Sequence, residues 1–137
     1  GICGFAKALE LTAQNAKEKR ERLARLKDRL IANLTDNTAF FVNNAEGNYA
    51  PHIISPRVNN VRAEVLLHAL EAHGICISAG SACHKGKSSH VVSALHLDKK
   101  TAAGVIRISF GPDTSRADID GLYQALLNHK NQRFPML

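Results

Sequence analysis

The sequence predicts an α/β protein, an α+β two-layer sandwich in which helices pack a small mixed or antiparallel sheet and a long helix comes first. Helical and strand patterns alternate along the chain, which favours layers of both kinds. Hydrophobic residues make up 45% and charged residues 22% of the sequence, a balance that supplies a core. The 137 residues are expected to form one domain over 1–137.

The first expected element is one long helix over about residues 4–34. Neither Gly nor Pro interrupts the run after Phe5, and good helix formers dominate it. Its charged face, between Lys17 and Arg29, carries seven basic residues and three acids. We interpret this face as solvated surface, with nucleic-acid or partner docking as the alternative. The opposite stripe consists of apolar residues at helical spacing: Leu23, Leu26, Leu30, Ile31 and Leu34.

The middle of the chain predicts short strands around a turn. Residues 38–43 and 52–55 carry strand patterns, and residues 57–60 are a possible extension of the second strand. Residues 44–48 have turn composition. Pro51 and Pro56 indicate an edge or a bulge in the second strand.

The second half predicts the remaining elements. A helix over 62–73 is followed by Gly74, where a left-handed residue is wanted, and then by a strand over 75–78. Residues 91–97 predict one or two helical turns, and 104–110 form the strongest strand pattern. A last helix is expected to run to about residue 129, with Thr114 or Ser115 as its cap and Asp118 in its first turn.

Cys83 is the first candidate for chemistry. Four small residues precede it, and two lysines and two histidines follow within seven positions, a basic setting that favours the thiolate. The alternative is a surface thiol without a role. By contrast Cys76, between two isoleucines, is interpreted as a small core residue, and Cys3 lies near the start of the chain. With three cysteines and no metal-binding spacing, we expect reduced thiols and a cytoplasmic protein without a metal site.

Arg107 is the second candidate, because it interrupts an apolar strand. By alternation it shares a face with Val105 and Ser109. A guanidinium there could clamp a substrate carboxylate through two parallel hydrogen bonds. A structural ion pair, or a side chain on the solvent side of the sheet, are the alternatives.

Two stretches of the sequence, SAGSACHKGKSSHVVSAL and VIRISFGPDTSRADID, resemble the C-terminal part of cysteine desulfurases. These are class V aminotransferase-like enzymes of the fold-type I pyridoxal-phosphate group. The opening GICGFAKALEL resembles the stretch where the family's large domain passes into its small domain. The chain as a whole is therefore similar to the C-terminal small domain, with the large cofactor-binding domain absent.

The resemblance implies roles for the two candidates. Cys83 matches the nucleophile that takes the sulfur of L-cysteine as a persulfide and leaves alanine, for iron–sulfur cluster or thio-cofactor assembly. Arg107 matches the residue that binds the substrate carboxylate. The resemblance also implies a sulfur-acceptor or scaffold protein as partner and a homodimer for the full-length enzyme. The catalytic loop that would carry the persulfide comprises Ser81, His84, Lys85, Gly86, Lys87, Ser88, Ser89 and His90.

One departure limits what the chain does alone. The family holds pyridoxal phosphate on a lysine in an S-x-H-K-type motif, which this sequence lacks. We therefore expect no cofactor-binding residue here and an inactive isolated chain. The family also implies that a large domain covers the apolar stripe of the first helix. Selenocysteine lyase or cysteine-sulfinate chemistry, and a non-catalytic basic interaction module, are the alternatives. No segment is apolar enough to span a membrane, and nucleic-acid binding is disfavoured because Phe5 is the one aromatic residue in the first helix.

Overall fold

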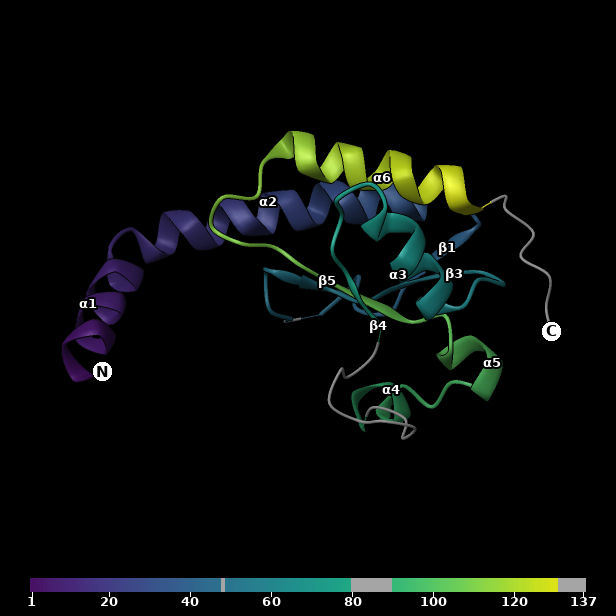
Figure 1. Ribbon diagram of the computed structural model, residues 1–137, viewed down its shortest axis with the longest axis horizontal. Coiled ribbons are helices and arrows are strands. Elements are labelled where there is room, and N and C mark those ends of the chain that lie inside the picture. Colours follow the sequence, from purple (N-terminus) through teal and green to yellow (C-terminus); the bar gives the residue numbers. More distant parts are fainter. Residues whose placement is uncertain (48, 80–89, 131–137) are drawn as a thin grey trace.

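The computed structural model describes residues 1–47, 49–79 and 90–130. Over these residues the chain forms helices and short strands in mixed order, as the sequence predicts (Figure 1). The elements are α1 (Ile2–Ala13), α2 (Ala16–Thr35), β1 (Phe40–Val42), β2 (Ile53–Ile54), β3 (Pro56–Val58), α3 (Ala63–Glu71), β4 (Ser78–Ala79), α4 (His90–Ala94), α5 (Lys99–Ala102), β5 (Ile106–Ser109) and α6 (Arg116–Lys130).

The prediction of one long N-terminal helix is wrong, because the helix breaks between α1 and α2. Gln14 is extended, and Asn15 adopts the left-handed conformation with φ 55°. Asparagine enters this region more readily than most residues, so a break needs neither Gly nor Pro. Beyond the break α1 extends away from the rest of the molecule (Figure 1).

The strands pair antiparallel throughout the described residues. One sheet has the order β1-β3 and the other the order β2-β5-β4. A bridge between Arg57 and Val105 joins the two sheets. The predicted second strand divides into β2 and β3 around Ser55, at the proline that follows it.

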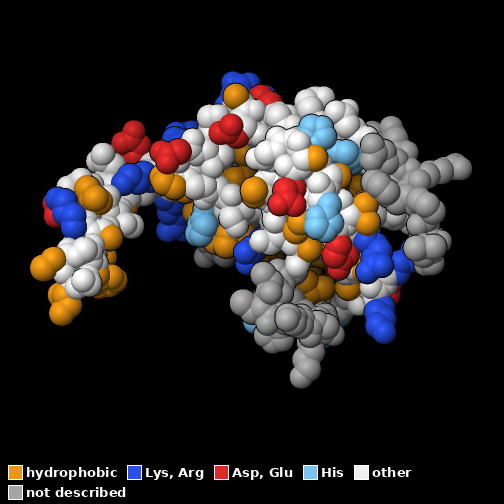
Figure 2. All heavy atoms as spheres, viewed as in Figure 1, with side chains coloured by type: hydrophobic (Ala, Val, Ile, Leu, Met, Phe, Trp, Pro, Cys, Tyr) orange, Lys and Arg blue, Asp and Glu red, His pale blue; other side chains and the backbone are white. Residues whose placement is uncertain are grey.

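The core lies between these sheets and the helices α2, α3 and α6. Leu30 and Leu34 of α2 are fully buried against it, together with Leu66 of α3 and Leu126 of α6. The expectation that a large domain covers the α2 stripe is therefore wrong, because the stripe packs within this domain. The two most exposed large apolar side chains of the described residues belong to α1 instead, where Ile2 is 87% and Phe5 73% exposed (Figure 2).

The later elements agree with those predicted from the sequence, with two differences. Ser115 caps α6 by accepting a hydrogen bond from the Asp118 N–H at 3.2 Å, and Gly74 is left-handed at φ 73°, as expected. The predicted strand over 75–78 is shorter, since β4 pairs at Ser78 and Ala79. Helix α5, which was not predicted from the sequence, is capped by Asp98, whose carboxylate accepts from the N–H groups of Lys100 and Thr101.

Candidate functional site

Arg107 lies on the outer face of β5, away from the core. Its neighbours Ile106 and Ile108 are buried, whereas Arg107 and Ser109 are exposed, which confirms the predicted alternation within β5. Val105, which the sequence places on the same face, is buried. None of the ion pairs among the described residues involves Arg107. The structural ion pair considered from the sequence is therefore not formed within this part of the chain, and the guanidinium faces solvent.

The neutral hydroxyl group of Ser78 contacts this guanidinium. Arg107 Nη2 donates to Ser78 Oγ at 3.2 Å, and Ser78 lies opposite Arg107 in the β4–β5 pair. On the other side, the register of β2 with β5 places Ser55 opposite Arg107. Ser55 Oγ in turn accepts from Asn43 Nδ2 at 3.3 Å. The hydrogen bond to Ser78 can orient the arginine without neutralising its charge.

A second arginine, Arg57, lies on the same face and was missed from the sequence. The backbone of Arg57 forms an isolated β-bridge with Val105, which is two residues from Arg107. The guanidinium of Arg57 stacks 4.2 Å from the centroid of the Phe41 ring. Its Nε and Nη1 atoms are buried without a hydrogen-bond partner among the described residues. The signal was available in the sequence, because Arg57 interrupts a short apolar pattern in the way that Arg107 does.

The other predicted site residues are only partly described. Cys83 and the loop residues Ser81 and 84–89 lie outside the described residues, as do Lys85 and Lys87. His90 is exposed at the start of α4. The structure thus places the two ends of this segment, at Ala79 of β4 and at His90.

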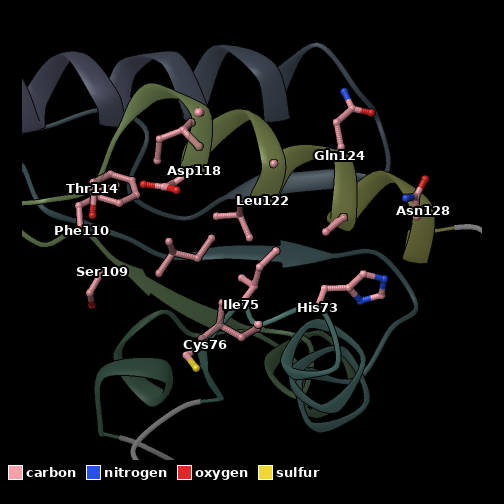
Figure 3. Close-up of a pocket in the computed structure, with 17 residues that line it drawn as sticks. His73, Ile75, Cys76, Ser109, Phe110, Thr114, Asp118, Leu122, Gln124 and Asn128 are labelled. Carbon is pink, nitrogen blue, oxygen red and sulfur yellow. The ribbon is translucent and has the colours of Figure 1, made fainter.

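Cys76 is exposed, so the prediction of a core thiol is wrong. The apolar pattern around Cys76 suggested a buried strand, but pairing with β5 begins only at Ser78, after Cys76. Cys76 instead lines an open groove of about 660 Å³ between residues 73–77, the end of β5 and α6 (Figure 3). Leu122 of α6 points into the groove above Ile75.

The basic face of α2 is partly used within the domain. Arg29 forms a two-point contact with Asp120 of α6, at 2.7 and 2.9 Å, which lowers the pKa of that carboxyl. Arg22 donates to the carbonyls of Thr114 and Pro112. Burial lowers the pKa of Lys27, whose ammonium donates to the Ala50 carbonyl at 3.2 Å.

A match to a protein-family model identifies the class of this protein. The family model described as aminotransferase class-V matches residues 1–122. The chain therefore belongs to the class-V aminotransferase family.

Its curated relatives are cysteine desulfurases. The chain is 32% identical over 127 residues to cysteine desulfurase IscS 1 of Archaeoglobus fulgidus, covering 91% of this chain and 33% of that protein. It is also 32% identical over 141 residues to cysteine desulfurase IscS of Clostridium botulinum strain Hall, covering 99% of this chain and 36% of that protein. The chain thus spans about a third of the length of the curated relatives it matches.

Solved structures support the fold. A NifS-like protein from Rickettsia africae superposes with a TM-score of 0.81 at 24% identity, over 93% of this chain and 33% of that one. The cysteine desulfurase CsdA of Escherichia coli superposes with a TM-score of 0.74 at 19% identity, over 93% of this chain and 29% of that one. These likenesses confirm the mixed architecture of small antiparallel sheets packed by helices.

The described residues do not fit pyridoxal phosphate, the cofactor implied by this family. The groove beside α6 is lined by no lysine or arginine. Lys27 is the buried lysine of the described residues, and the Ala50 carbonyl and the Tyr49 ring already hold its ammonium. We therefore derive no step through the cofactor from these residues. Within the same ranges no cluster of His, Cys, Asp and Glu could hold a metal ion, and no helix is long and apolar enough to cross a membrane.

Proposed function

We propose that this chain is the sulfur-accepting part of a longer cysteine desulfurase. In this proposal Cys83 takes the sulfur atom of L-cysteine as a persulfide, and alanine leaves. The bond cleavage in the substrate depends on the cofactor, which other parts of the longer protein would hold. Two facts support the proposal: the relatives are named cysteine desulfurases, and the chain spans about a third of their length.

The observation that carries the proposal is that Arg107 forms no ion pair among the described residues. A guanidinium on a rigid strand, held by the Ser78 hydroxyl and without an acidic partner among the described residues, is suited to an external carboxylate. Ser78, which contacts Arg107, lies in β4, five residues before Cys83. The proposed carboxylate-binding residue therefore contacts the strand that leads to the proposed nucleophile. The proposal assigns the α-carboxylate of L-cysteine to Arg107.

The persulfide on Cys83 is proposed to pass to an acceptor or scaffold protein for iron–sulfur cluster or thio-cofactor assembly. The basic loop after Cys83 supports this role through its composition, because lysines and histidines favour the anionic persulfide. We further propose that the full-length protein is a cytoplasmic homodimer.

The test is release of sulfide and alanine from L-cysteine by the longer protein with pyridoxal phosphate and a reductant. Cys83→Ser should abolish release. Arg107→Lys should lower kcat/KM by about 10- to 100-fold, since a charge-assisted hydrogen bond contributes about 1.5–3 kcal/mol. Arg62→Lys is the matched control, because Arg62 is exposed at the start of α3 and pairs with Glu64.

Two outcomes would contradict the proposal. Release that survives Cys83→Ser would indicate selenocysteine-lyase-like chemistry, in which the thiol is not essential. Release by the isolated 137-residue chain at an enzymatic rate would show that the cofactor site lies within it, contrary to the geometry of its described lysines.

A further inference from the structure

The outer face of the sheet carries two arginines, Arg57 and Arg107. The antiparallel register of β2 with β5 continues to the bridge between Arg57 and Val105. Residues opposite each other in an antiparallel pair lie on the same face, and so do residues two apart along one strand. Arg57 and Arg107 are therefore diagonal neighbours on this face, with their Cα atoms about 7–8 Å apart. Long side chains can act on one ligand at this spacing.

The guanidinium of Arg57 is held in place but has no anionic partner. It stacks 4.2 Å from the ring centroid of Phe41, the residue directly opposite it in the β1–β3 pair. Its Nε and Nη1 atoms are buried without a hydrogen-bond partner among the described residues. Such burial of a charged donor costs stability, so a position of this kind calls for an acceptor. Arg57 as a whole is only partly buried, which leaves a route for a ligand to its guanidinium.

The acidic side chains of this chain do not supply that acceptor. The sequence has 12 Asp and Glu residues, and all of them lie in the described ranges. The ion pairs that they form involve other bases: Lys7, Arg29, Arg62 and His68. The charges of Arg57 and Arg107 are therefore not neutralised by any acidic side chain of the 137 residues. Two unpaired guanidinium groups on one rigid face are suited to a ligand with two acidic groups.

We propose that Arg57 is a second anion-binding residue beside Arg107, and that the two together bind an α-amino acid with an acidic side chain. The inference rests on the proposal that Arg107 binds the α-carboxylate of an amino acid. Arg57 then takes the acidic group of the side chain through charge-assisted hydrogen bonds from its guanidinium. The stack on Phe41 fixes the direction of this guanidinium before the ligand arrives. Arg57 thus determines specificity, because it favours an acidic side chain over a neutral one of the same shape.

A pair of isosteric ligands tests the proposal without reference to sulfur release. L-Aspartate and L-asparagine have the same shape and differ in the charge of the side chain. Calorimetric titration of the longer protein should give a dissociation constant at least about tenfold lower for L-aspartate, since charge-assisted hydrogen bonds are the stronger ones. Arg57→Met should bring the two constants within about twofold of each other. Arg107→Met should weaken binding of both amino acids alike.

The matched control is Arg62→Met, which removes an exposed arginine and should keep the preference for L-aspartate. Equal constants in the unchanged protein, or no measurable binding of L-aspartate, would overturn the inference. The outcome is separate from that of the proposed function. A protein that releases sulfide from L-cysteine but does not prefer L-aspartate refutes only the role of Arg57. A protein that prefers L-aspartate through Arg57 but releases no sulfide refutes only the desulfurase proposal.

Thermal unfolding separates a ligand-binding residue from a structural one. Arg57→Met removes a buried charge without a partner and keeps an apolar contact with the Phe41 ring. The thermal midpoint should therefore be unchanged or raised, both in the 137-residue chain and in the longer protein. A fall of more than about 4 °C in either protein would contradict the inference. A fall in the longer protein alone would assign Arg57 to an acid of that protein instead of a ligand.

Discussion

Leu30→Ala in the 137-residue chain tests whether the α2 stripe is an internal core. Leu30 is fully buried where α2 packs with α6 and β1. Leu→Ala at such sites costs about 2.7–5 kcal/mol, because the transfer free energy is lost and a cavity remains. We expect a loss of about 3 kcal/mol in the free energy of unfolding. For a chain of this size that corresponds to a fall in Tm of about 10 °C.

The assay is urea unfolding followed by circular dichroism, at constant m-value. Leu9→Ala is the matched control, because Leu9 belongs to α1 and is 60% exposed. It should change the unfolding free energy by less than about 0.5 kcal/mol. If the two substitutions cost the same, or if Leu30→Ala costs under about 1 kcal/mol, the α2 stripe is not the core of this domain and our reasoning fails.

Two further predictions concern charged groups of α2. The hydrogen bond from Arg29 lowers the pKa of Asp120, so this contact stabilises the fold at neutral pH. Its contribution is lost as the pH falls below the ordinary aspartate value of about 3.9 and through the lower folded value. Arg29→Gln should therefore flatten the fall of the urea midpoint between about pH 5 and pH 2, and parallel curves would contradict this. Burial lowers the pKa of Lys27, so stability should rise as the pH approaches the unfolded lysine value of about 10.4. Lys27→Met should remove this rise at equal or higher stability, whereas a variant that unfolds more easily at neutral pH would show that the ammonium contributes net stability.

Local sequence patterns predicted the structure correctly where a residue's conformation depends on its near neighbours in the sequence. The alternation around Arg107, the Ser115 cap and the left-handed Gly74 are all of this kind. Each follows from backbone geometry within a few residues. The sequence therefore predicted the fold class correctly, whereas the solvent-facing position of Arg107 was one of the alternatives that it left open.

Patterns failed where distant contacts decide the outcome. Cys76 has the sequence neighbours of a buried strand residue, but its segment does not pair with β5 before Ser78, and the thiol is exposed. The α2 stripe gave no indication of which partner covers it, because the contact with α6 joins residues about 90 positions apart, as in Arg29 with Asp120. The break at Asn15 was missed because helix propensity does not exclude asparagine from a helix. The proposed role of Cys83 stays a prediction.

The break at Asn15 also has a consequence for cooperativity. Helix α1 contributes no buried residue to the core, and an isolated helix of 12 residues is marginal in water. The unit that unfolds in one step therefore begins near Arg22, the first residue of α2 that is not exposed and that contacts the rest of the domain, and the turns before it fray independently. A melting curve of this chain reports on the domain after the break, and the order of α1 depends on whatever covers Ile2 and Phe5.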